Sequence, residues 1–205
     1  NISNIYNHAI ANGVYCEEIK NNKEICKIEP RIKSKEALWI PSAGIIDSHG
    51  LMHKLEYLIK SCESTIVYNT EVTDIAHENE NYILSLKNLD YNAKTKIVVN
   101  SAGLCCDKVS AMVGIDNYKL HICKGEYYKT SMYRNELNSL IYPLPTEISL
   151  GTHIVKRLDG TIGFGPNAYY VDEIDYSMDD RHKPDFLEQI NTYLDLNEKD
   201  LSKDF

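Results

Sequence analysis

The spacing of apolar residues predicts one long amphipathic helix near the middle of the 205-residue chain. Between residues 48 and 62, apolar side chains recur every three or four positions and form one stripe. Asp47 or Ser48 can cap this helix, because either side chain can accept hydrogen bonds from the backbone N–H groups of the first turn. Shorter helices are predicted at residues 2–12, 23–28, 107–113 and 184–194.

Short apolar runs predict strands in two groups. The first group is separated by turn-rich segments and reads as a β-meander inserted between a βα unit and a strand that rejoins a main sheet; it comprises residues 65–69, 72–76, 82–87 and 96–100. The second follows a boundary near Tyr118 and reads as an antiparallel sheet; it comprises residues 121–130, 139–142, 151–157 and 161–164. Residues 14–19 and 37–40 are also predicted to be extended.

The stretch from residue 95 to residue 106 is the clearest candidate for a ligand site. Residues 97–99 are apolar and predict a buried strand, which ends at Ser101, Ala102 and Gly103 before a helix. In open α/β sheets, ligands lie beyond the carboxyl ends of the strands, where small residues let the backbone approach a cofactor. We therefore expect a nucleotide cofactor here, although the small residues could instead serve packing alone.

Composition narrows the class of protein. Apolar residues make up 43% of the chain and charged residues 25%, as in soluble globular proteins. The net charge of −8 and the pI near 5.4 argue against nucleic acid or an anionic membrane surface as a partner. No apolar run approaches the roughly 18 residues of a membrane span. The sequence begins without Met and without a signal peptide, so we expect it to start inside a longer chain.

The cysteines and histidines do not indicate a metal site. None of the six cysteines forms a CxxC pair, which excludes zinc-ribbon and thioredoxin-like classes and favours reduced thiols in the cytosol. His49 and His53 are four residues apart on the predicted helix, a spacing that can hold a metal ion. No glutamate follows His49 as the HExxH motif requires, and no third ligand is evident. We therefore predict no metal.

Six motifs, in order along nearly the whole chain, resemble the FAD-dependent D-amino-acid-oxidase-like (DAO) family. They are PSAGIIDSH at 41–49, VVNSAGL at 98–104, KGEYY at 124–128, IYPLP at 141–145, LGTH at 150–153 and GFGPNA at 163–168. Together they are most similar to the L-2-hydroxyglutarate dehydrogenase (oxidase) branch of this family. The resemblance implies FAD as the cofactor and an oxidoreductase activity.

The resemblance also implies an α+β fold. Part of an FAD-binding α/β region is expected at residues 44–117, joined to an antiparallel substrate-binding region at 11–43 and 118–205. Members of the family begin with a GxGxxG unit that holds the FAD pyrophosphate and end with a second glycine-containing segment. Neither is found in the sequence, so residues 1–205 are expected to be the central fragment of such an enzyme.

The cofactor-binding residues that the resemblance implies are Val72, Ser101, Ala102 and Gly103. Val72 would present its backbone to the adenine ring. His153 is the expected general base, because oxidising a 2-hydroxy acid requires the hydroxyl proton to leave as hydride moves to the flavin. Its alternative is a half-exposed strand histidine.

The expected substrate-binding residues are Lys124, Tyr127, Tyr142 and Asp47. A dicarboxylate substrate needs a cation, and tyrosine hydroxyls can supplement it. Each residue also has a structural interpretation: Lys124 as a solvated lysine at a strand edge, Tyr142 as a packing residue, and Asp47 as the helix cap.

The expected reaction is oxidation of L-2-hydroxyglutarate, a 2-hydroxy acid, to 2-oxoglutarate. One alternative is another DAO-family reaction, on glycerol 3-phosphate or an amino acid. Another is a non-catalytic remnant or subunit that associates with a polypeptide carrying the missing FAD-binding half. We expect a cytoplasmic protein, free or peripheral to the inner membrane, with a membrane electron acceptor as one option.

Overall fold

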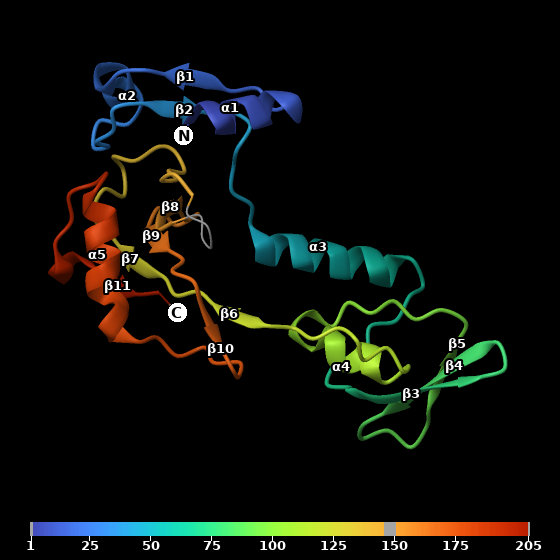
Figure 1. The fold of residues 1–205 in the computed structure, drawn as a ribbon. Coiled ribbons are helices and arrows are strands. Elements are labelled where there is room, and N and C mark those ends of the chain that lie inside the picture. Colours follow the sequence, from blue (N-terminus) through green and yellow to red (C-terminus); the bar gives the residue numbers. More distant parts are fainter. Residues whose placement is uncertain (1, 146–150, 205) are drawn as a thin grey trace. The chain divides into compact units, whose positions relative to one another are not determined.

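The structure, a computed structural model, describes residues 2–145 and 151–204. The chain divides into two compact units (Figure 1). The first comprises Asn1–Asp47 and Cys123–Phe205, and the second comprises Ser48–Ile122. Each unit has its own sheet structure. The assignment of residues 44–117 to cofactor binding, and of 11–43 and 118–205 to substrate binding, stays a prediction.

The first unit is built around a four-stranded antiparallel sheet in the order β11-β7-β9-β8. Its strands are β7 (Tyr128–Thr130), β8 (His153–Lys156), β9 (Ile162–Gly165) and β11 (Ser202–Lys203). The strands predicted at 151–157 and 161–164 are thereby confirmed. The short strand β11 at the edge was not predicted.

The predicted strand at 121–130 is divided in two by residues 125–127. The first part, β6 (Ile122–Lys124), pairs with β10 (Tyr169–Val171), and only the second part, β7, joins the main sheet. The predicted strand at 139–142 is reduced to a single bridge between Ile141 and Ile154.

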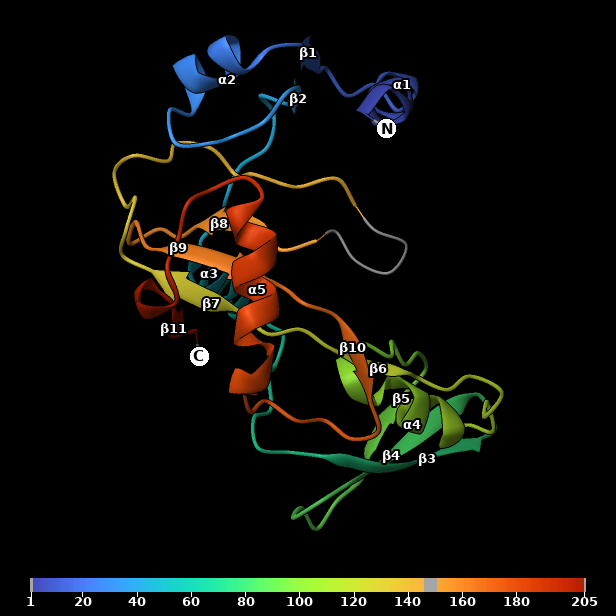
Figure 2. The same ribbon diagram turned by 60° about the vertical axis from the view of Figure 1, so that its left-hand side comes forward.

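Helix α5 (Lys183–Asn191) packs against the sheet of the first unit (Figure 2). Pro184 fits its first turn, where the backbone N–H has no helical partner. Phe186 and Ile190, four residues apart on one face, are buried against the sheet. The fully buried residues at the centre of this core are Tyr128, Leu137, Ile154, Ile162, Phe164, Phe186, Ile190 and Leu194.

The N-terminal part of the first unit is a two-stranded antiparallel ribbon with two helices. It comprises α1 (Ile2–Ala11), β1 (Glu17–Ile19), α2 (Asn22–Ile28) and β2 (Ala37–Trp39), which confirms the predicted elements. Gly13 ends α1 with a left-handed φ of 73°. Ile25 on α2 joins the core described above, so the ribbon is part of this unit's packing.

The second unit contains α3 (Ser48–Ser61), the three-stranded meander β3-β4-β5 and helix α4 (Cys106–Ala111). The strands are β3 (Val72–Glu78), β4 (Asn81–Leu86) and β5 (Ala93–Thr95). The long helix and the strands predicted at 72–76 and 82–87 are confirmed, whereas β5 lies in residues for which no strand was predicted. Three 3₁₀ turns complete the described chain: η1 (Gly103–Cys105) in this unit, and η2 (Asp180–His182) and η3 (Glu198–Asp200) in the first.

Two predicted strands of the second unit are wrong. Residues 65–69 and 96–100 have strand-like composition but are not strands in the structure. Ile97 and Val99, expected to be buried, are 76% and 80% exposed. The physical reason is that a strand is stable only when its backbone groups pair with another strand, and the described residues provide no such partner for either segment.

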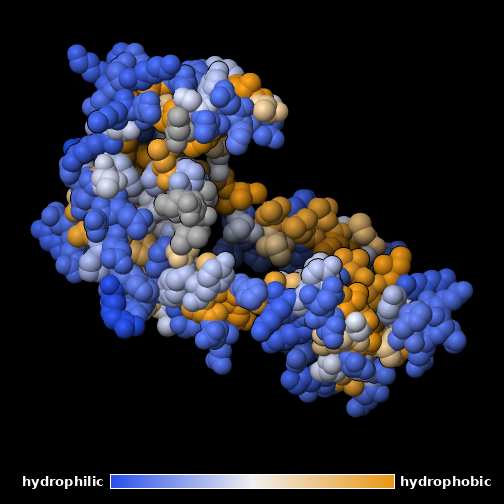
Figure 3. Space-filling model, viewed as in Figure 1, coloured by the Kyte–Doolittle hydropathy of each residue, from blue (hydrophilic) through white to orange (hydrophobic). Residues whose placement is uncertain are grey.

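The apolar stripe of α3 is also exposed. Figure 3 shows hydrophobic side chains gathered along this helix. They belong to Leu51, Met52, Leu55, Leu58 and Ile59. The spacing of the stripe predicted the helix correctly, although no described residue of the helix is buried.

The core of the first unit should dominate its stability. Replacing Phe164 with Ala removes a fully buried ring from β9 and should lower the free energy of unfolding by about 3–5 kcal/mol. The matched control Leu158→Ala changes an exposed side chain in the β8–β9 turn and should stay within about 0.5 kcal/mol of the original protein. Denaturant titration followed by circular dichroism measures both. Equal losses for the two variants would contradict the position of this core.

Candidate functional site

His153, Tyr127 and Tyr142 lie together in the first unit. His153 is the first residue of β8, opposite Gly165 of β9, and is only 6% exposed. Its ring stacks on Tyr142, with centroids 4.7 Å apart and planes at 22°. Tyr127 meets the same ring edge-on at 6.2 Å and 84°. The alternative interpretation of His153 as a half-exposed strand histidine is therefore wrong.

Burial sets the charge of His153. Removal from water lowers the pKa of its imidazole below the ordinary value of 6.5, and a backbone hydrogen bond at Gly151 only partly offsets this. Its Nδ1 is the one buried side-chain nitrogen or oxygen for which the described residues provide no hydrogen-bond partner. A neutral imidazole can accept a proton, so this side chain has the properties of a general base.

Two glycines allow the backbone to close tightly beside His153. A Cβ at Gly165, whose φ is +147°, would come within 2.6 Å of the Glu126 carbonyl oxygen and 2.8 Å of the Tyr127 ring. A Cβ at Gly125 would come within 2.8 Å of Pro166. No larger residue fits at either position without a shift of the backbone or the ring. Segments 125–127 and 165–167 are therefore in direct contact.

Lys124 is not the solvated strand-edge lysine that its alternative interpretation described. Its side chain is 9% exposed, and its Nζ forms an ion pair with Asp175 at 2.6 Å. The hydrogen bond to Asp175 is the main cause that raises the pKa of Lys124, against the effect of burial. A substrate carboxylate at this lysine would have to share it with Asp175. Substrate binding by Lys124 stays a prediction.

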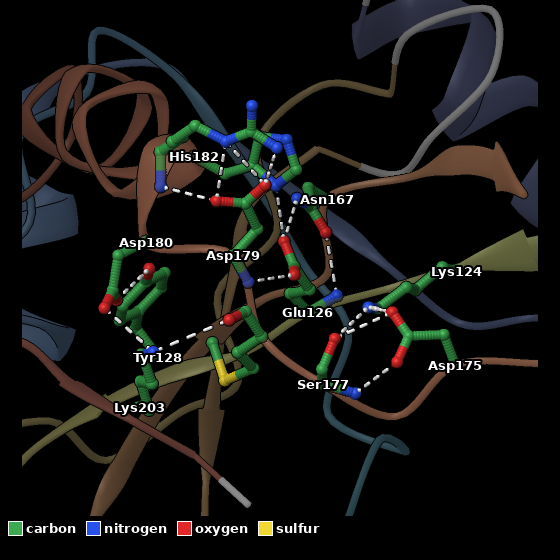
Figure 4. A network of polar contacts seen from close by, with 12 residues as sticks. Lys124, Glu126, Tyr128, Asn167, Asp175, Ser177, Asp179, Asp180, His182 and Lys203 are labelled. Atoms are coloured by element: carbon green, nitrogen blue, oxygen red, sulfur yellow. Dashed lines mark hydrogen bonds and ion pairs between the residues drawn. The ribbon is translucent and has the colours of Figure 1, made fainter.

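Glu126 was not singled out by the sequence, yet it is the centre of a polar network (Figure 4). Its side chain is nearly fully buried and accepts hydrogen bonds from the Asp179 backbone N–H at 2.8 Å and from Asn167 Nδ2 at 2.9 Å. His182 Nδ1 lies 2.7 Å from the same carboxylate. Burial alone would raise the pKa of Glu126, but the hydrogen bonds together lower it, so the carboxylate stays ionised. The only signal in the sequence was its place inside the KGEYY motif.

Thr152 anchors the backbone immediately before His153. Its N–H and hydroxyl donate to the side-chain oxygen of Gln189, at 3.3 and 2.9 Å. Its carbonyl oxygen accepts from the Tyr193 hydroxyl at 2.5 Å. Burial raises the pKa of Tyr193, which therefore stays protonated and able to donate. The position of His153 is thus fixed from its main chain as well as from its ring.

The predicted cofactor residues lie in the second unit. Ser101, Ala102 and Gly103 are exposed, and η1 begins at Gly103. Gly103 has a left-handed φ of +55°, and no heavy atom lies within 4 Å of the position that a Cβ would take. Asn100 fixes this turn, because its Oδ1 accepts from the Ala102 N–H at 3.2 Å and its Nδ2 donates to the Cys106 carbonyl at 2.8 Å. Val72 is the first residue of β3.

Ile97 and Val99, just before this turn, are exposed, and cofactor binding by residues 101–103 and Val72 stays a prediction. No group of three His, Cys, Asp or Glu residues in the described part of the chain is placed to hold a metal ion. His49 and His53 are exposed on α3.

Asp47 is exposed and directly precedes α3. It belongs to the first unit, while α3 belongs to the second. Both its capping role and its role near a substrate stay predictions. Among the residues that the structure describes, no helix has the length and apolar character needed to cross a membrane.

Comparison with known proteins defines the class of this chain. Residues 2–203 match the DAO family, described as FAD dependent oxidoreductase. The match covers almost the whole chain, and the chain therefore belongs to this family. The resemblance predicted from the six motifs and the predicted α+β flavin-oxidoreductase fold are confirmed.

Curated relatives carry the name L-2-hydroxyglutarate dehydrogenase. The protein from Escherichia coli strain K12 is 30% identical over 170 residues, which are 80% of this chain and 39% of the relative. The mitochondrial protein from Arabidopsis thaliana is 24% identical, over 83% of this chain and 44% of the relative. The chain thus spans about two fifths of the length of these relatives.

Solved structures share the fold. L-α-glycerophosphate oxidase from Mycoplasma pneumoniae, determined with FAD bound, has a TM-score of 0.85 at 22% identity and covers 98% of this chain and 55% of that chain. Glycine oxidase from Bacillus cereus has a TM-score of 0.80 at 16% identity and covers 100% of this chain and 54% of that chain. FAD, predicted from the resemblance, is the cofactor of the family to which this chain belongs.

The burial of His153 predicts a dependence of stability on pH. Its pKa is lower in the folded state than the ordinary 6.5, so below about pH 6.5 the unfolded chain binds a proton that the folded chain resists. The contribution of neutral His153 is present above the unfolded pKa and is lost as the pH falls towards the folded pKa. The free energy of unfolding should therefore fall between pH 7.5 and 5.5, and it should fall less in His153→Gln.

Denaturant titrations at several pH values measure this difference. The matched control His8→Gln changes an exposed histidine on α1 and should keep the pH dependence of the original protein. An identical pH dependence in His153→Gln and the original protein would contradict the burial of a neutral imidazole.

Proposed function

We propose that this chain is part of an FAD-dependent oxidoreductase that oxidises L-2-hydroxyglutarate to 2-oxoglutarate. The observation that carries the proposal is the buried His153 between Tyr142 and Tyr127. Its Nδ1 forms no hydrogen bond with any described residue. The substrate is proposed from the relatives named L-2-hydroxyglutarate dehydrogenase, at about 30% identity. Because the chain spans only about two fifths of the length of these relatives, the activity of the whole protein is a proposal as well.

In this proposal, FAD supplies the acceptor for the hydride that leaves the hydroxyl-bearing carbon. His153 takes the hydroxyl proton, since burial keeps the imidazole neutral and ready to accept it. Tyr142 holds the imidazole plane by stacking, and Tyr127 restricts it from the side. The ring can therefore receive the proton at a fixed position.

Recognition of the substrate carboxylates falls to Tyr127, Tyr142 and Lys124. Tyrosine hydroxyls can donate hydrogen bonds, and burial and the neighbouring Tyr142 raise the pKa of Tyr127. Lys124 supplies a positive charge that Asp175 already holds in place. Residues Ser101, Ala102 and Gly103, with the backbone of Val72, would hold part of FAD.

The substrate is tested by reduction of the bound flavin. Purified protein loaded with FAD should lose the visible absorbance of its oxidised flavin under anaerobic conditions on addition of L-2-hydroxyglutarate. Glycerol 3-phosphate and glycine, the substrates named for the two structural neighbours, should leave the absorbance unchanged. Bleaching by either of these compounds, without bleaching by L-2-hydroxyglutarate, would assign the protein to another reaction of the family.

The role of His153 is tested by substitution. His153→Asn keeps a polar side chain but removes the base, and kcat should fall by about 10²–10⁴-fold. The flavin spectrum should be unchanged. The matched control His121→Asn alters an exposed histidine just before β6 and should keep full activity. Loss of less than about threefold in His153→Asn would exclude His153 as the base.

The cellular location, a membrane electron acceptor and association with a polypeptide carrying a missing half stay predictions. An absorbance spectrum of the purified 205-residue chain bears directly on the last of these. A retained flavin would show that the chain binds FAD without such a partner.

A further inference from the structure

The buried carboxylate of Glu126 has no part in the chemistry proposed above, yet it is fixed more completely than any residue of that site. It is 2% exposed and lies in the connection between β6 and β7. The hydrogen bonds from Asp179 and Asn167 and the contact with His182 come from two other segments of the first unit. A buried charge with this many partners keeps those segments in one arrangement.

The bonds between Glu126 and Asn167 are reciprocal. The Glu126 backbone N–H donates to Asn167 Oδ1 at 2.7 Å, and Asn167 Nδ2 donates to the Glu126 carboxylate at 2.9 Å. The first bond fixes the orientation of the Asn167 amide, so its nitrogen must point at the carboxylate. The pair therefore works as a clamp between segments 125–127 and 165–167.

The clamp closes next to His153. Gly165 is the register partner of His153 across β8 and β9, and the space for a Cβ at Gly165 is filled by the Tyr127 ring. Tyr127 follows Glu126 directly in the chain, and its ring meets His153 edge-on. Any separation of the two segments would thus move the Tyr127 ring away from Gly165 and from the imidazole.

We propose that Glu126 and Asn167 are positioning residues that hold the Tyr127 ring against His153 and keep water from the imidazole. The importance of this inference for catalysis rests on the proposed function. The position of the Tyr127 ring and the exclusion of water can be tested without any activity. Glu126 does not touch the imidazole and acts only through Tyr127 and Gly165.

The experiment follows His153 by NMR in the full 205-residue chain labelled with ¹³C and ¹⁵N, with the imidazole signals assigned through His153→Gln. Asn167→Ala removes the clamp but leaves the other partners of the Glu126 carboxylate, among them Asp179 and His182. We expect the pKa of His153 to rise towards its ordinary value and the nuclear Overhauser effect between the Tyr127 and His153 rings to weaken. Glu126→Gln should act in the same direction. In one orientation the new amide NH₂ faces the donating Asp179 N–H, and in the other it faces the donating Asn167 Nδ2.

The matched control is Lys203→Met. Lys203 belongs to the same polar network and pairs with Asp180 at 2.8 Å, without a contact to Glu126 or Asn167 (Figure 4). It should leave the His153 titration and the ring contact unchanged. If Glu126→Gln fails to fold, Asn167→Ala still decides the matter.

A folded Asn167→Ala protein with an unchanged His153 pKa and an unchanged ring contact would overturn the proposal, even if its melting temperature fell. Such a result would leave Glu126 as a purely structural group. Because both readouts are independent of turnover, a failure of the protein to oxidise L-2-hydroxyglutarate would count against the proposed function and not against this inference.

Discussion

The close approach of residues 125–127 to residues 165–167 is the constraint on which the candidate site of the first unit depends. Gly125 and Gly165 have no room for a Cβ, so the two segments meet backbone to backbone and backbone to ring. The buried Glu126 carboxylate stabilises this contact by accepting hydrogen bonds from Asn167, within the second segment, and from the Asp179 backbone. Tyr127, which lies within this contact, then meets the His153 ring edge-on. His153 itself begins strand β8, and a side chain on a strand is held more accurately than one on an exposed loop.

The same small region contains two buried ionisable groups, one of which favours its charged form and the other its neutral form. The difference lies in how far hydrogen bonds offset the effect of burial on each pKa. Burial disfavours the charged form of both Glu126 and His153. Glu126 stays charged because backbone and side-chain donors stabilise its carboxylate. His153 favours the neutral form because burial lowers the pKa of its imidazole, and the backbone hydrogen bond at Gly151 offsets this only in part. Ionisable groups with perturbed pKa values cluster at functional sites, and this region contains two of them.

The second unit differs from the first because several of its large apolar side chains are exposed. Its meander pairs all of its strands internally, whereas Ile97, Val99 and the apolar stripe of α3 stay exposed. The turn that follows residue 99 is nevertheless well defined, since Asn100 holds it from both sides. An ordered, exposed turn of small residues is consistent with membership of a family described as FAD dependent oxidoreductase. The local sequence is thus sufficient to form this turn without the burial that its apolar residues led us to expect.

The sequence by itself determined the family, the helices and most of the strands. These follow from local spacing and from motifs whose residues are close together in the chain. It could not determine that residues 96–100 lack a strand partner, or that Lys124 is paired with Asp175, 51 positions away. It also gave no reason to select Glu126, whose partners lie 41 to 56 positions away. Only the tertiary structure decided these points, because strand pairing, burial and charge neutralisation depend on residues that folding brings together.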